Sequence, residues 1–116
     1  MESRPEVTVT RDGDDITIAA TGALDLFNCR EFHDALLDVA DSAERVTIDL
    51  RDAQYIDTAV LADVAVGANK MRARQKRLTV VVATPTHPHR ALEITGLTAI
   101  LDLQVEALPE PQDPAE

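Results

Sequence analysis

The apolar run Leu78-Thr79-Val80-Val81-Val82-Ala83 constrains the fold more than any other stretch of the chain. A strand with one face in water alternates apolar and polar residues, whereas a nearly continuous run is typical of a strand covered on both faces. Such strands belong mainly to parallel sheets, because the crossover connections of a parallel sheet place helices over it. The run therefore predicts a strand at 78–83 and an α/β fold.

The segment before this run has the clearest helical pattern. Residues 58–75 place their apolar side chains on one stripe, formed by Val60, Val64, Met71 and either Gly67 or Ala68, and widened by Leu61 and Ala65. Arg45 to Leu50 reads as another strand. Strand 45–50, helix 58–75 and strand 78–83 together predict a βαβ unit with a right-handed crossover.

The N-terminal third predicts a hairpin followed by a helix. Segments 7–10 and 16–21 are rich in β-branched residues and flank a turn-rich linker at 11–15. The helix that follows carries Phe32, Leu36 and Val39 at spacings of four and three. Asn28 with Glu31 three residues later has the form of a capping box at the start of this helix.

The C-terminal third predicts a short helix at about 87–95, ended by Gly96, and a last strand at 101–106. The expected element order is ββαβαβαβ, a mixed and mostly parallel sheet flanked by amphipathic helices. Residues 1–108 are expected to form one domain. Residues 109–116 combine three prolines with three acids, so we expect a disordered tail there.

The composition narrows the classes of function. The 116 residues include 21 acids against 11 bases, and a formal charge of −10 argues against nucleic acid or an anionic membrane as the main partner. The core must be aliphatic, since Phe27, Phe32 and Tyr55 are the only aromatic residues. No apolar run approaches the roughly 20 residues of a membrane helix, and Cys29 is the only cysteine, so a cytoplasmic protein without membrane insertion is expected.

Three short stretches resemble the STAS domain of anti-sigma-factor antagonists. Gly22-Ala23-Leu24-Asp25 is similar to the family's G-x-L-D turn, and Leu92-Glu93-Ile94-Thr95-Gly96-Leu97 to its L-x-x-x-G-L ending. Thr47-Ile48-Asp49-Leu50-Arg51 followed by Tyr55-Ile56-Asp57-Thr58 resembles its strand, loop and phosphorylation motif. The resemblance implies a STAS fold and phosphorylation-controlled binding to an anti-sigma-factor kinase, which regulates sigma-factor-dependent transcription.

The phosphorylation motif differs from its usual Asp-Ser-Ser-Gly form. This chain has Asp57-Thr58-Ala59-Val60, which is more similar to the STAS domains of stressosome proteins. The resemblance implies that Thr58 accepts phosphate and that Asp25, Asp57, Thr58, Ala59 and Val60 form the partner-binding surface. Valine in the first turn of the helix is expected to limit how closely a partner's backbone can approach.

Thr58 also has a physical interpretation that is independent of any family. It stands where a loop becomes a helix, a position that favours Ser, Thr, Asp or Asn as the N-cap. A phosphate there would add about −1.5 to −2 charges at the positive end of the helix dipole, next to Asp57. A plain N-cap that is never modified gives the same pattern, so this alternative stays open.

The expected partner is an anti-sigma-factor serine/threonine kinase or a related ATPase-fold protein, which would hold the ATP. We expect neither an enzyme nor a bound cofactor, because no phosphate loop, nucleophile elbow or credible catalytic set is present. The alternatives are a structural STAS subunit of a stressosome or of a lipid-transport ABC system, or a ligand-binding STAS domain. The oligomeric state, monomer or dimer, is left open.

Several other residues have a functional and a structural interpretation. Five cations between Lys70 and Arg77 can bind an acidic partner, although cations near a helix end more often complement its dipole. His87 and His89 are expected at an exposed helix start rather than at a metal site. Cys29 at a helix start is either a reactive thiol or a packed side chain. His33 is expected to form a surface pair with Asp34, and the role of Asp49 is unresolved.

Overall fold

A computed structural model describes residues 5–108 of the chain, and the elements below are those of this part. Six strands form a single sheet. Along the chain they are β1 (Glu6–Asp12), β2 (Asp15–Leu24), β3 (Arg45–Asp49), β4 (Ala53–Ile56), β5 (Thr79–Thr84) and β6 (Asp102–Ala107). The helices are α1 (Arg30–Ala40), α2 (Thr58–Ala73), α3 (His87–Ile94) and the short 3₁₀ turn η1 (Leu97–Ala99). The expected mixed α/β fold is confirmed.

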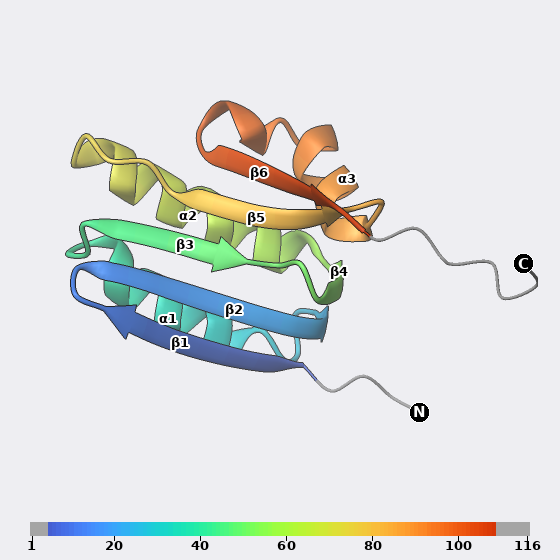
Figure 1. The fold of residues 1–116 in the computed structure, drawn as a ribbon. Coiled ribbons are helices and arrows are strands. Elements are labelled where there is room, and N and C mark those ends of the chain that lie inside the picture. Colours follow the sequence, from blue (N-terminus) through green and yellow to red (C-terminus); the bar gives the residue numbers. More distant parts are fainter. Residues whose placement is uncertain (1–4, 109–116) are drawn as a thin grey trace, which may run out of the picture.

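The sheet has the strand order β1-β2-β3-β5-β6, with β1 antiparallel to β2 and the other neighbours parallel (Figure 1). β2 is ten residues long and pairs with β1 along one edge over most of its length. On its other edge β2 pairs first with β3, up to Ala19, and then with β4, from Gly22 to Leu24. The β2–β4 register shifts by one residue of β4, because Gly22 lies opposite Ala53 and Ala23 opposite Tyr55. The end of β2 thus lies next to the segment that leads into α2.

The helices all lie on one face of the sheet, as Figure 1 shows. Burial alternates along β2 because of this arrangement. Ile16, Ile18 and Leu24 are buried beneath the helices. Thr17 and Thr21, on the opposite face, are partly exposed. The expectation that strand 78–83 is covered on both faces is confirmed by its burial, although the described helices lie over only one of them (Figure 1). Val81 and Ala83 on the open face are nevertheless only 8% and 3% exposed.

Several contacts hold α1 against α2. Gly67 allows a close approach, since a Cβ atom added there would lie 3.0 Å from the side chain of Leu36. Arg74, just after α2, donates hydrogen bonds to the carbonyl oxygens of Ala40 and Ala43 at 3.1 and 2.9 Å. These carbonyls lie at and beyond the end of α1, where no further helical turn supplies donors. Both Gly67 and Ala68 are buried, so the apolar stripe includes the two.

The structure agrees with most of the expected elements. The hairpin, the βαβ unit with β3 parallel to β5, the closing strand and the left-handed Gly96 after α3 (φ 76°) are confirmed. Strand β4 was not expected, because the sequence predicts a loop at these residues. Its four residues are too few to show a period, and they read buried, exposed, exposed, buried rather than alternating.

The expected capping box at α1 is wrong. The N-cap of α1 is Cys29, which makes no side-chain capping hydrogen bond, and the side chain of Asn28 is used within the preceding loop instead. The expected tail at 109–116 lies outside the described residues. Within residues 5–108, no helix is both long and apolar enough to cross a membrane.

Candidate partner-binding site

The carboxylate of Asp57 joins two segments at the end of the sheet where the parallel strands stop. Asp57 is the N-cap of α2, with extended backbone (φ −98°, ψ −175°), and its Oδ1 accepts a hydrogen bond from the N–H of Ala59 at 2.9 Å. Its Oδ2 accepts from the backbone N–H of Leu26 at 2.8 Å. The start of α2 is thereby tied to the β2–α1 loop, residues 25–29.

The β2–α1 loop is closed by reciprocal hydrogen bonds between Asp25 and Asn28. Oδ1 of Asp25 accepts from the N–H groups of Phe27 and Asn28, and Oδ1 of Asn28 accepts from the N–H of Asp25 at 2.8 Å. The Asn28 amide also donates to the carbonyl of Ala23 at 3.0 Å. This ordered loop presents two apolar side chains to solvent, Leu26 at 66% and Phe27 at 93% exposure. Side by side in sequence, they give the loop an exposed apolar surface of the kind that can mark a protein–protein contact.

Thr58 is the first residue of α2, and its side chain is exposed. The expectation that Thr58 caps the helix is wrong, because Asp57 does so. Asp is among the best N-cap residues. Because Asp57 takes the cap and accepts from the N–H of Ala59, Thr58 occupies the first helical position. The hydroxyl of Thr58 makes no hydrogen bond with any of residues 5–108. The fold therefore leaves this hydroxyl open to solvent.

The five residues expected at the partner surface are only partly brought together there. Asp25 and Asp57 each hold the β2–α1 loop, Thr58 is exposed and Ala59 is half-buried. Val60 has no exposed surface and belongs to the core. The expectation that Val60 limits the approach of a partner is therefore wrong. Leu26 and Phe27 were not expected at this surface, because apolar residues in a short loop give no periodic signal.

Comparisons with known proteins address the fold and the family. A family model described as "Mlab, STAS domain" matches residues 7–104. The chain belongs to the STAS domain family. The resemblance noted in the sequence is thus confirmed at the level of the family. No curated protein matches the chain.

Solved structures similar to this STAS domain share its fold. An anti-sigma factor antagonist from Mycobacterium paratuberculosis has a TM-score of 0.78 at 20% identity, with 90% of each chain covered. A putative anti-sigma factor antagonist from Thermotoga maritima has a TM-score of 0.73 at 16% identity, covering 84% of this chain and 85% of that one. The phosphorylated form of the Bacillus cell fate determinant SpoIIAA has a TM-score of 0.65 at 12% identity, covering 90% and 93%.

His87 supports the strand that leads into the Asp57–Thr58 corner of this STAS domain. Its ring stacks on Tyr55 with the ring centroids 4.5 Å apart, and its Nδ1 accepts a hydrogen bond from the N–H of Ile56 at 3.3 Å. The other histidine of this segment, His89, contacts Thr84 through Nδ1 and Glu93 through Nε2. The expected exposed helix start is correct for His87, but both rings also make specific contacts. The stack with Tyr55 was not foreseeable, since 32 residues separate the pair in the sequence.

Cys29 is buried in the STAS domain and is not an activated thiol. Burial raises the pKa of the Cys29 thiol, and the negative charges of Asp63 and Asp57 raise it further. His33, expected to pair with Asp34, instead contacts Asp63 on α2 with 2.6 Å between Nδ1 and Oδ1. Both observations favour structural roles for these residues.

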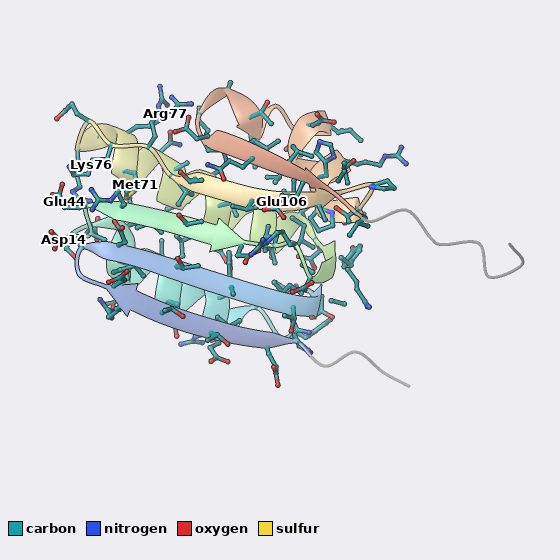
Figure 2. All side chains as sticks on the ribbon, in the orientation of Figure 1. Asp14, Glu44, Met71, Lys76, Arg77 and Glu106 are labelled. Carbon is teal, nitrogen blue, oxygen red and sulfur yellow. The ribbon has the colours of Figure 1, made fainter. Side chains whose placement is uncertain are left out.

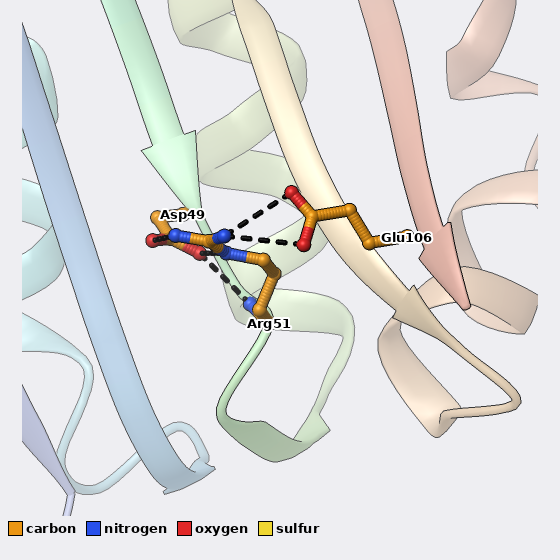
Figure 3. Close-up of polar contacts among 3 residues, drawn as sticks. All are labelled: Asp49, Arg51 and Glu106. Carbon is orange, nitrogen blue, oxygen red and sulfur yellow. Dashed lines mark hydrogen bonds and ion pairs between the residues drawn. The ribbon is translucent and has the colours of Figure 1, made fainter. Parts of the chain in front are cut away.

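Asp49 has a structural role on the open face of the sheet. The guanidinium of Arg51 contacts both carboxylate oxygens of Asp49, at 3.0 and 2.8 Å, and reaches across β5 to Glu106 on β6 (Figure 3). These hydrogen bonds from Arg51 hold the pKa of Asp49 below its usual value. The group connects β3 to the edge strand β6 and helps to cover the open face of β5.

The cations around the end of α2 are mostly paired within the domain. Figure 2 shows Lys76, Glu44 and Arg77 at the end of the sheet where the parallel strands begin. Lys76 contacts Glu44 at 2.9 Å, and the hydrogen bond from this lysine lowers the pKa of the glutamate. Arg77 contacts Asp102 at 2.7 Å, and Lys70 contacts Asp41 at 3.2 Å. The pairing supports the structural interpretation of these cations.

Proposed function

We propose that this STAS domain is an anti-sigma-factor antagonist whose binding to a partner protein is controlled by phosphorylation of Thr58. The observation that carries the proposal is the arrangement of an exposed Thr58 hydroxyl directly after Asp57, which also holds the loop with Leu26 and Phe27. Structures of two proteins described as anti-sigma factor antagonists, and of SpoIIAA in a phosphorylated form, share the fold and support this function.

The position of Thr58 suits a switch that changes the surface and leaves the fold intact. A phosphate on its hydroxyl adds about −1.5 to −2 charges at the positive end of the α2 dipole, which tolerates negative charge. The same charge joins those of Asp57 and Asp25. A partner surface that is apolar or acidic at this place would therefore lose affinity after phosphorylation. An apolar contact with Leu26 and Phe27 would be the first to be disturbed.

The partner in this proposal is an anti-sigma-factor serine/threonine kinase or a related ATPase-fold protein. The kinase supplies ATP, because transfer of its γ-phosphoryl group to the Thr58 hydroxyl forms the phosphoester and releases ADP. Unphosphorylated antagonist binds the kinase and frees the sigma factor. Phosphorylated antagonist dissociates, and the kinase becomes available to the sigma factor again.

The test uses the purified chain, its cognate kinase and ATP. Mass spectrometry is expected to find one phosphate, on Thr58, and Thr58→Ala should accept none. Thr58→Glu should weaken kinase binding by at least about tenfold, a loss of roughly 1.4 kcal/mol. Thr10→Glu, which adds the same charge at an exposed threonine of β1, is the matched control. No phosphate on the wild type, together with unchanged binding of Thr58→Glu, would overturn the proposal.

A second candidate is a structural subunit of a lipid-transport ABC system or of a stressosome. The observation that favours it is the description of the matching family model, which refers to Mlab and not to sigma-factor regulation. Binding would then be constitutive, and Thr58 would be an interface residue. Co-purification of a transporter ATPase, with equal recovery from wild type and Thr58→Glu, would support this candidate over the first.

A further inference from the structure

A pocket of about 490 Å³ lies beside the connection from β5 to α3 and the outward side of α3. It is lined by Pro85, Thr86, His87, Arg90, Ala91 and Ile94. The pocket lies outside the carboxyl end of a parallel strand, which is where open α/β sheets commonly bind ligands. Its volume is in the range of small-molecule sites.

The lining combines an apolar surface with one unpaired cation. Pro85, Ala91 and Ile94 supply the apolar part, and the side chain of Ile94 is 78% exposed. Arg90 forms neither an ion pair nor a side-chain hydrogen bond with any residue from 5 to 108. Arg77, at the other end of the sheet, by contrast forms an ion pair with Asp102. A free guanidinium beside an apolar surface suits an anion that carries an apolar group.

His87 supplies a second donor to the same pocket. Because its Nδ1 accepts from the N–H of Ile56, the neutral ring carries its proton on Nε2. Nε2–H is then the group of the ring that remains to donate to an occupant. The hydroxyl of Thr86 is already used, since it donates to the carbonyl of Ala83 and accepts from the N–H of His89. Among the polar side chains that line the pocket, Arg90 and His87 therefore have donors that the fold of residues 5–108 leaves unused.

We propose that this pocket binds a small organic carboxylate with an apolar group of a few carbon atoms. The carboxylate accepts hydrogen bonds from the guanidinium of Arg90 and from Nε2–H of His87. The apolar group covers Ile94 and Ala91 and removes their surface from water. The effect of ligand binding is transmitted to the Asp57–Thr58 corner through the hydrogen bond between His87 and Ile56. The ligand thus acts next to the proposed phosphorylation site without contacting it. The proposal stands independently of whether Thr58 is phosphorylated.

The test is a titration of the ¹⁵N-labelled full chain, followed by amide chemical shifts. Hexanoate carries both the charge and the apolar group, acetate carries the charge alone and 1-hexanol carries the apolar group alone. Hexanoate is expected to give saturable shifts at residues 86–94 and at Ile56, with a dissociation constant on the order of 1 mM, as its few heavy atoms allow. Acetate and 1-hexanol should each bind at least about tenfold more weakly.

Two variants identify the side chains that recognise the ligand. Arg90→Gln should weaken hexanoate binding about tenfold and leave the weak binding of 1-hexanol unchanged. Ile94→Asn should weaken both. Arg72→Gln, at an exposed arginine of α2 outside the pocket, is the matched control and should bind hexanoate like the wild type. Unchanged spectra of the free variants outside 85–94 show that the fold is retained.

Three results would overturn the proposal. The first is the absence of saturable shifts at about 10 mM hexanoate, a concentration well above the expected dissociation constant. The second is equal binding of hexanoate and 1-hexanol, and the third is equal binding by the wild type and Arg90→Gln. If no small probe binds but a purified protein partner protects Ile94 and Arg90, the pocket is a protein docking surface and the ligand proposal is wrong.

Discussion

Oδ2 of Asp57 accepts a hydrogen bond from the backbone N–H of Leu26, at 2.8 Å and across 31 positions of sequence. The same carboxylate caps α2 through its Oδ1. One side chain thereby fixes both the start of the helix that carries Thr58 and the loop that exposes Phe27. The two parts of the candidate surface are consequently held in one arrangement before any partner arrives.

Substitution of Asp57 separates its two roles. Asp57→Ala removes both hydrogen bonds and should lower the free energy of unfolding by about 1–3 kcal/mol. Asp57→Asn keeps its Oδ1 as an acceptor for the cap, but the amide nitrogen in place of Oδ2 cannot accept from Leu26. The loss of stability should therefore be smaller, while hydrogen exchange at Leu26 still accelerates. Urea denaturation and exchange measured by NMR test this. Equal stability of wild type and Asp57→Ala would contradict the double role.

Gly67 should not tolerate a larger side chain, although glycine is a poor helix former. Alanine would gain up to about 1 kcal/mol of helix propensity, but its Cβ would lie 3.0 Å from the buried Leu36, and overpacking typically costs about 1–3 kcal/mol. Gly67→Ala should therefore be destabilised by as much as about 2 kcal/mol in urea denaturation. The cost of this substitution should decrease in a Leu36→Val background. An additive double variant would show that the two residues do not compete for space.

The Asp49–Arg51 contact should make stability depend on pH in the acid range. Because Arg51 lowers the pKa of Asp49 in the folded state, the contact stabilises the fold above the unfolded pKa of about 3.9 and loses its effect as the pH falls through the lower folded value. Asp49→Asn should be less stable than wild type near neutral pH, and the difference should shrink as the pH falls through the lowered folded pKa of Asp49. Unfolding midpoints measured across this range test the sign. In an Arg51→Met background the difference should no longer depend on pH.

Cys29 should react slowly with thiol reagents. Its raised pKa leaves less thiolate at neutral pH, and its 8% exposure limits access. Alkylation by iodoacetamide near pH 7.5 should be at least about tenfold slower than that of glutathione, and denaturation by urea should remove the difference. A rate equal to that of glutathione in the folded state would contradict the assignment of Cys29 as a packed side chain.

The sequence predicts the elements that have a clear period and misses those that depend on pairing. The stripe on α2 and the apolar run of β5 are decided by local spacing, and both are found. β4 forms because β2 extends beyond its pairing with β3 and its edge pairs there with residues 53–56, which show no strand period of their own. The apolar run predicts burial on both faces of β5, which is found, but on the open face the side chain of Arg51 crosses the strand toward Glu106 and no helix within residues 5–108 covers it.

In the candidate site too, the sequence predicts what local spacing decides and misses what depends on contacts between distant residues. Asp57 and Thr58 stand at a strand-to-helix junction that the sequence identifies, yet which of them caps the helix depends on backbone geometry. The sequence places Val60 both in the apolar stripe of the helix and, through the resemblance to the family motif, at the partner surface, and its complete burial agrees with the stripe. The contacts of Asp57 with Leu26 and of His87 with Ile56 join residues about thirty positions apart, which a local pattern cannot reveal.

The pairing of β2 along both of its edges has a consequence for the timing of structural fluctuations. Since β2 is hydrogen-bonded along both edges to β1, β3 and β4, its amides can be released only when several strands separate together, so they should be among the slowest to exchange with solvent. The Asp57 backbone N–H bonds to the carbonyl of Leu24 at the end of this strand. A change of charge at Thr58 thus acts on a corner anchored to the most slowly opening part of the molecule, and the affinity for a partner can change many times without any cycle of unfolding.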